Sequence, residues 1–161
     1  MGTTSYAIAI GSNRWGRHGA PEREVAGAIA ALSHVVAVSR IIRSAPVGPS
    51  TRRFANAVVV VESGKSPPEL LAELKRIERA FGRRGGRRWG ARLIDLDIIL
   101  WSGGMWADAT LVVPHPTFRA RRFVLDPLVT IAPLWRDPVT GLAMRQLAYR
   151  LRAVDRRRRH P

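Results

Sequence analysis

Short β-rich runs alternate with amphipathic helical patterns along the N-terminal part of the chain, and this order constrains the fold more than any other feature. The β-rich runs cover residues 5–11, 35–44, 54–62 and 94–101. Apolar residues at helical spacing follow Pro21 and Pro67, and proline suits a first helical turn. The order β-α-β-β-α-β is typical of a ferredoxin-like antiparallel sheet with helices on one face. We therefore predict an α+β fold with a C-terminal extension that contains short helices near 122–132 and 143–152.

The length and composition favour one soluble domain. The chain has 161 residues, 46% of them hydrophobic, and neither an internal repeat nor a linker interrupts it. There is no cysteine, which excludes a disulfide scaffold and a thiolate metal site. No apolar run approaches the roughly 20 residues that span a bilayer, and the N-terminus lacks a signal-peptide pattern. We expect a cytoplasmic protein with one domain over 1–155 and a basic, disordered tail over 156–161.

The charge is strongly positive. Lys and Arg total 27 against 12 Asp and Glu, a formal net charge of +15. Such a surface attracts phosphate, whether on a nucleotide or on nucleic acid, so a nucleic-acid-binding module is one interpretation. RNA-binding sheets of this kind carry aromatic residues on a central strand, whereas the corresponding strand here carries Asp95 and Asp97. We therefore expect neither a nucleic-acid partner nor a membrane partner.

Two carboxylates on one strand form the most informative pattern. In an extended strand Ile94, Leu96, Ile98 and Leu100 share one face, while Asp95 and Asp97 share the other, about 7 Å apart. Two carboxylates so close repel each other, and a cation between them removes that cost. Ligation by oxygen alone suits Mg²⁺, and such a pair can hold two metal ions that bridge a polyphosphate. The alternative is an ordinary strand with aspartates on its wet face.

An arginine- and glycine-rich segment precedes these carboxylates. It contains Arg83, Arg84, Arg87, Arg88 and Arg92 among flexible glycines. Arginine forks bind phosphate oxygens in pairs and can stabilise charge on a transferring phosphoryl group. On its own the segment could equally be a solvated charge run, but its position next to the aspartates favours phosphate binding.

Two further features have both functional and structural interpretations. His115 lies between Pro114 and Pro116, ahead of several arginines, which suits either a nucleotide contact or a structural histidine. Phe54 and Asn56 share one face of a strand, where they could stack on and pair with a flat heterocycle or belong to the core. The segment around Gly64 and Lys65 is not a P-loop, because position 59, where that motif needs glycine, is valine.

Together these residues resemble the 6-hydroxymethyl-7,8-dihydropterin pyrophosphokinase family. The segment RWGARLIDLDII, residues 88–99, matches the family signature throughout. Ordered matches extend from Gly11-Ser12-Asn13 through Phe54-Ala55-Asn56 and Pro114-His115-Pro116 to Ile131-Ala132-Pro133. The resemblance implies an enzyme that transfers pyrophosphate from MgATP to the hydroxymethyl group of the pterin, giving the pterin diphosphate and AMP in folate biosynthesis. It implies two Mg²⁺ ions and ATP as co-substrate.

The resemblance also implies a role for individual residues. The metal ligands would be Asp95 and Asp97. The catalytic residues would be these two with Arg83, Arg92, His115 and Arg121. ATP would contact Glu78, Arg84, Arg88, Trp89, Ile98, His115, Pro116 and Arg121. The pterin would contact Ser44, Val47, Phe54, Asn56 and Phe123.

The chain departs from the family pattern in the segment before Phe54, which reads Ser50-Thr51-Arg52-Arg53. This departure leaves the metal ligands and Asn56 in place. We expect a monomer that acts on small molecules. A catalytically inactive homologue that serves as an interaction partner is the third interpretation, and ATP-dependent pterin binding would exclude it.

Overall fold

The computed structural model describes residues 2–44, 53–82 and 93–160. Its first part contains β1 (Thr4–Ser12), α1 (Pro21–Ala31), β2 (Val35–Val38), β3 (Ile42–Ser44), β4 (Phe54–Ser63), α2 (Pro67–Gly82) and β5 (Asp95–Trp101). The C-terminal part contains β6 (Trp106–Ala107), β7 (Val112–Val113), the short 3-10 helix η1 (Phe118–Ala120), α3 (Arg122–Ile131) and α4 (Met144–Arg159). Both helices expected near 122–132 and 143–152 are therefore present, the second longer than expected.

The main sheet is antiparallel. Its strands follow the order β2-β4-β1-β5, and β3 also pairs with β4. The predicted combination of helices with an antiparallel sheet is confirmed, and the strand order is compatible with a ferredoxin-like arrangement. The β-rich run over 35–44 forms two short strands, both paired with β4.

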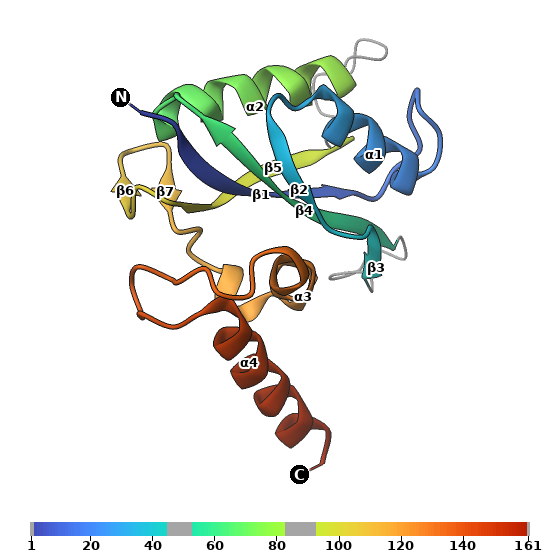
Figure 1. Cartoon of the computed structure of the whole chain (residues 1–161). Coiled ribbons are helices and arrows are strands. Elements are labelled where there is room, and N and C mark those ends of the chain that lie inside the picture. Colours follow the sequence, from blue (N-terminus) through green and yellow to red (C-terminus); the bar gives the residue numbers. More distant parts are fainter. Residues whose placement is uncertain (1, 45–52, 83–92, 161) are drawn as a thin grey trace.

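Helices cover both faces of this sheet (Figure 1). Helices α1 and α2 pack on one face through a core that includes Val25, Leu74 and Leu96. On the other face, α3, α4 and η1 pack through a core that includes Val58 and Leu125. The prediction of helices on one face describes α1 and α2, and the C-terminal helices, which were predicted without a face, cover the other. The second layer is needed because β4 is buried along nearly its whole length, so apolar side chains on both of its faces must be covered.

A β-bulge in β5 changes which residues share a face. Opposite β1, Ala7 pairs with Leu100 and Ile8 pairs with Ile98, which leaves Ile99 as an extra residue. As a result Leu100 joins Ile99 in the core beneath α3, whereas Ile98 stays in the core beneath α2. The prediction that Leu100 shares the face of Ile98 was wrong, because strict alternation breaks at a bulge.

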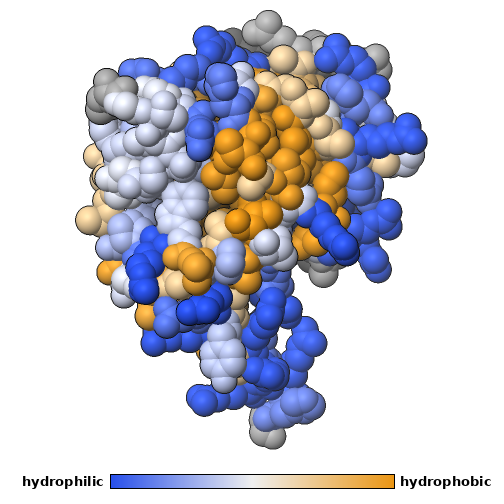
Figure 2. Space-filling model, viewed as in Figure 1, coloured by the Kyte–Doolittle hydropathy of each residue, from blue (hydrophilic) through white to orange (hydrophobic). Residues whose placement is uncertain are grey.

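The last helix is anchored at its start and extends from the body. Met144 and Leu147 are buried in the core beneath α3. The rest of α4 projects outward in Figure 1, and Figure 2 shows this arm covered mostly by hydrophilic side chains. The helix runs to Arg159, so it includes four residues, 156–159, of the tail that was expected to be disordered. In the described ranges, no helix combines the length and the apolarity that crossing a membrane requires.

Candidate active site

A row of three residues crosses three neighbouring strands near the end of β1. Gly11 of β1 is directly opposite Asn56 of β4 on one side and Asp95 of β5 on the other. Directly paired residues of antiparallel strands project to the same face. Gly11 has no side chain, so the space between Asn56 and Asp95 stays open, and a Cβ at Gly11 would lie 3.1 Å from Asn56 Oδ1.

A second row lies two residues further along. Asp97 pairs with Ala9, which pairs with Val58. Ala9 and Val58 belong to the core beneath α3, so both aspartates project toward the face that the C-terminal part covers. Asp97 is half-buried and Asp95 is exposed. The prediction that the two carboxylates share one face of the strand is thus confirmed.

A cavity of about 360 Å³ brings the predicted metal ligand Asp97 together with three of the predicted nucleotide residues, Ile98, His115 and Pro116. Leu71, Lys75, Leu96, Asp108, Ala109, Thr110, Leu111 and Val112 also line it. Sequence reasoning did not single out Asp108 or Thr110. Their signal is the Asp-x-Thr spacing, which is typical of a carboxylate that bonds its own backbone two residues on.

The surroundings of His115 determine its protonation. Its backbone N–H donates to the Ile99 carbonyl at 2.9 Å, and its Nδ1 accepts from the Thr117 N–H at 3.2 Å. Burial lowers the pKa of His115, the Asp97 carboxylate opposes this, and Arg121 lowers it further. The imidazole is therefore mainly neutral at pH 7. Since Nδ1 accepts, the ring proton is on Nε2, which can donate to an anionic oxygen.

The predicted pterin residues that the structure describes lie on β3, β4 and α3. Asn56 is only 6% exposed, and its Nδ2 donates to Ser44 Oγ at 2.8 Å. Phe54 pairs with Ser44, and α3, which carries Phe123, packs on β3 and β4. The Arg121 guanidinium lies 5.6 Å from the centre of the Phe123 ring, so the predicted phosphate and pterin residues adjoin here.

Glu78 holds the strand that carries the aspartates. It lies on α2, is 8% exposed, and its Oε1 accepts from the Leu96 backbone N–H at 2.8 Å. Lys75 donates to the other oxygen at 3.2 Å. Because Leu96 lies between Asp95 and Asp97 in the strand, this bond fixes the position of the two carboxylates relative to α2. A contact between Glu78 and the nucleotide remains a prediction.

Six predicted site residues lie outside the described ranges: Val47, Arg83, Arg84, Arg88, Trp89 and Arg92. The same holds for three of the four atypical residues before Phe54, of which only Arg53 is described. Gly11 lies between Asn56 and Asp95, and sequence reasoning used it only for the resemblance, although a glycine inside a strand often marks a close approach of another group.

Comparison with known proteins agrees with this geometry. Residues 7–133 match the model of the family described as 7,8-dihydro-6-hydroxymethylpterin-pyrophosphokinase. Proteins named 2-amino-4-hydroxy-6-hydroxymethyldihydropteridine pyrophosphokinase are similar to the chain. The one from Synechocystis is 41% identical over 75% of this chain and 65% of its own length. The one from Haemophilus influenzae is 39% identical over 80% of this chain and 81% of its own length.

A solved structure shares the fold. The chain superposes on a Plasmodium falciparum HPPK-DHPS structure with pteroate at a TM-score of 0.72 and 14% identity, over 99% of this chain and 44% of that one. The chain thus spans about two thirds of the Synechocystis relative and less than half of the Plasmodium chain. From the family match and these relatives, the chain belongs to the 7,8-dihydro-6-hydroxymethylpterin-pyrophosphokinase family.

Proposed function

We propose that this protein transfers a pyrophosphoryl group from ATP to the hydroxymethyl oxygen of 6-hydroxymethyl-7,8-dihydropterin, giving the pterin diphosphate and AMP in folate biosynthesis. The observation that carries the proposal is the row Asn56–Gly11–Asp95. It sets an amide suited to a heterocycle and a carboxylate suited to a cation on either side of an open glycine. A heterocycle bound at Asn56 would extend its substituent toward the aspartates.

The donor set fits Mg²⁺. Asp95 and Asp97 supply oxygen ligands on one face of one strand. Across residues 2–44, 53–82 and 93–160, no group of three or more His, Cys, Asp or Glu is arranged around a metal position. Mg²⁺ needs no such group, because it keeps several waters and is held by one or two carboxylates together with substrate phosphates. Two Mg²⁺ ions, when bound, would neutralise charge on the ATP phosphates.

The nucleotide would occupy the cavity lined by Ile98, His115 and Pro116, with its phosphates toward Asp97. His115 Nε2 would donate to a phosphate oxygen, and Arg121 would hold a neighbouring one. By the resemblance, the nucleotide side of the site also includes Arg83, Arg84, Arg88, Arg92 and Trp89. Glu78 acts through its hydrogen bond with the Leu96 backbone.

The pterin would lie over Gly11 between Phe54 and Phe123, with its amide edge on Asn56 and Ser44 and Val47 beside it. The Asn56 side chain is already oriented by its bond to Ser44. Pre-orientation lowers the cost of binding because little side-chain freedom remains to be lost.

The chemistry needs positioning more than a strong base. Phosphoryl transfer passes through a loose transition state whose charge lies on the phosphoryl oxygens, so fixed cations and hydrogen-bond donors supply most of the catalysis. In this chain those donors would be Arg121 and His115, together with Arg83 and Arg92. Exclusion of water keeps the phosphoryl group for the pterin alcohol.

The proposal includes the type of sheet, the oligomeric state and the location of the protein. The strand order β2-β4-β1-β5 supports a ferredoxin-like sheet. The protein would be a monomer with one domain over residues 1–155. We propose that it works in the cytoplasm on small molecules, without nucleic acid or membrane.

Analysis of the nucleotide products tests the proposal. Purified protein is incubated with ATP and Mg²⁺, with and without 6-hydroxymethyl-7,8-dihydropterin. We expect AMP only when the pterin is present, in equal amount to the pterin consumed. Formation of ADP would contradict attack at the β-phosphorus. A protein that binds ATP and pterin without turnover would be an inactive homologue, and one that binds only random RNA, with steep salt dependence, would be a nucleic-acid module.

A further inference from the structure

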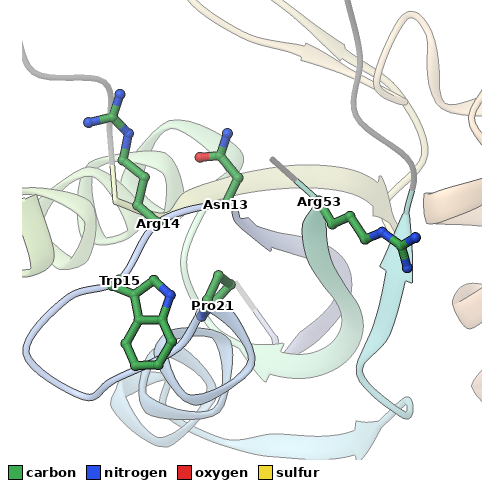
Figure 3. A pocket seen from close by; sticks show the side chains of 5 residues that line it. All are labelled: Asn13, Arg14, Trp15, Pro21 and Arg53. Atoms are coloured by element: carbon green, nitrogen blue, oxygen red, sulfur yellow. The ribbon is translucent and has the colours of Figure 1, made fainter. Parts of the chain in front are cut away.

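A second cavity, of about 580 Å³, opens at the end of the sheet where β1 finishes and β4 starts. Among the residues that the structure describes, Asn13, Arg14, Trp15, Pro21 and Arg53 line it, two of them cations and none of them acidic. Figure 3 shows Trp15 beside Pro21, with Asn13 and Arg14 on the segment after β1 and Arg53 on the opposite side. None of these side chains has a role in the site described above.

The segment that carries Arg14 and Trp15 is held in place by a buried carboxylate. Glu24 of α1 is 0% exposed, and it accepts from the His18 backbone N–H at 2.7 Å and lies 3.0 Å from His18 Nδ1. Gly16 packs so closely on Glu24 that a Cβ would lie 2.5 Å from Oε1. The His18 ring also stacks on Phe81, with 4.9 Å between ring centres. Burying a carboxylate costs free energy unless the group is hydrogen-bonded. The hydrogen bonds of Glu24 hold this segment in place.

Two side chains on this fixed segment have unmet binding capacity. Trp15 is 77% exposed, although its indole is among the largest apolar surfaces a residue can offer. Arg14 Nε is buried yet has no hydrogen-bond partner among the residues that the structure describes. Buried donors are nearly always paired, so an unpaired one points to an acceptor that arrives with a ligand.

The cavity adjoins the proposed active site on two sides. Arg53 directly precedes Phe54 on the pterin side. Asn13 follows Ser12, whose Oγ donates to the Leu93 carbonyl at 2.7 Å, two residues before Asp95. A molecule that leaves the Asn56–Asp95 row past the end of β1 and the start of β5 would therefore meet Arg14 and Arg53.

We propose that this cavity is a subsite for a planar heteroaromatic ring that carries phosphate, and that its ligand is the pterin diphosphate product on its way out. The inference rests on the proposed function. Trp15 and Pro21 offer apolar surfaces to the ring, Arg14 and Arg53 bind the diphosphate, and the Asn13 carboxamide can pair with a ring edge. The pterin substrate lacks the phosphate, and the position proposed for ATP is the other cavity, lined by Ile98, His115 and Pro116.

Equilibrium binding without ATP tests the proposal, with three probes: the pterin diphosphate, the unphosphorylated pterin and inorganic diphosphate. In Arg14→Ala and Arg53→Ala we expect about tenfold weaker binding of the pterin diphosphate, because each variant loses a charge-assisted bond. In Trp15→Ala we expect about three- to tenfold weaker binding, since a stacking partner is lost. Affinity for the unphosphorylated pterin should change less than about twofold in all three variants.

Arg17→Ala is the matched control, because Arg17 is an exposed arginine of the same segment that does not line the cavity. If Arg17→Ala weakens binding of the pterin diphosphate as much as the other arginine variants do, the effect comes from overall charge and the proposal is overturned. Inorganic diphosphate that binds as tightly as the product, with no effect of Trp15→Ala, would overturn the ring-binding part. If the wild type forms no AMP, the proposed function fails; if AMP forms normally and product affinity is the same in all variants, only this inference fails.

Discussion

Gly11 and Asn56 are directly paired across β1 and β4 and lie so close that a Cβ at Gly11 would be 3.1 Å from Asn56 Oδ1. The contact is tighter than ordinary van der Waals packing, so an added methyl group must displace the amide. Since Asp95 pairs with Gly11 on the other side, this glycine separates the two proposed substrate sides.

Gly11→Ala should therefore weaken pterin binding without unfolding the protein. We expect the pterin Kd to rise about two- to tenfold, because one hydrogen bond from Asn56 would be misaligned. ATP affinity and Tm should change little. Gly64→Ala is the control, because a Cβ at Gly64 meets no atom within 4 Å. Unchanged pterin affinity in Gly11→Ala, measured by titration calorimetry, would remove Gly11 from the site.

Asn56→Ala tests the proposed pterin amide contact directly. The variant removes a 6% exposed carboxamide and leaves Ser44 Oγ without its donor. We expect about tenfold or greater weakening of pterin binding, with ATP affinity nearly constant. The isosteric Asn56→Asp should lose as much, because it replaces the amide donor with an acceptor. Weakened ATP binding with intact pterin binding would mean that the two pockets are exchanged.

Asp97→Asn tests the proposed metal pair. The change keeps the size of the side chain and removes the charge, so we expect turnover to fall at least about 100-fold while the Tm stays close to that of the wild type. Asp155→Asn on α4 makes the same change in net charge away from the cavity and should retain activity. Steady-state AMP formation over a Mg²⁺ series is the measurement, and full turnover of Asp97→Asn at saturating Mg²⁺ would contradict the assignment.

Asp108 organises one wall of the cavity that is proposed to bind the nucleotide. Its Oδ1 accepts from the backbone N–H groups of Thr110 at 2.7 Å and Leu111 at 2.9 Å, and its Oδ2 accepts from Trp106 Nε1 at 2.7 Å. The bonds from Trp106 and Thr110 lower the pKa of Asp108 to about 2. Its contribution to the order of this segment is thus complete above the ordinary value of 3.8 and is lost as pH falls through about 2.

Asp108→Ala should accordingly raise the KM for ATP several-fold while kcat and the KM for the pterin change less. Asp108→Asn keeps an acceptor for the Thr110 and Leu111 N–H groups and should restore most of the ATP affinity. Between pH 5 and 9 the effect should be constant, because the carboxylate is ionised throughout. A fall in kcat alone, with the KM for ATP unchanged, would contradict a role in holding this wall.

Asp137 ties the C-terminal part together. It is 0% exposed and accepts two bonds from Arg119, at 2.6 and 2.8 Å, as well as bonds from the Val139 N–H and Thr140 Oγ1. Burial acts to raise the pKa of Asp137, but these hydrogen bonds outweigh it and lower the pKa. The stabilisation is therefore complete above the unfolded-state pKa and is lost as pH falls through the lower pKa of the folded state.

Asp137→Ala should lower the free energy of unfolding by about 3 kcal/mol, since it leaves Arg119 without its buried partner. Urea denaturation at pH 7 measures the loss. At acidic pH the difference between variant and wild type should shrink, because the wild-type carboxyl is then protonated. An equal difference at both pH values would show that packing, and not the ion pair, is lost.

Some features of the site follow from local sequence. The spacing of Asp95 and Asp97 determines that they share a face, because strand alternation has a period of two. The prolines at the starts of α1 and α2 and the apolar spacing behind them predicted both helices. Such features depend on neighbours along the chain, so periodicity is enough to find them.

Other features arise only when distant segments meet. The local sequence pattern does not predict the bulge at Ile99, which moves Leu100 to the core beneath α3. The bulge depends on how β5 pairs with Ala7 and Ile8 of β1. The row Asn56–Gly11–Asp95 depends on the register of three strands, and the fixed position of Trp15 depends on Glu24, from the next helix. The sequence by itself therefore determined the residue types and their local faces. Tertiary structure decided which of them face one another, because register and packing are set by contacts between segments far apart in the chain.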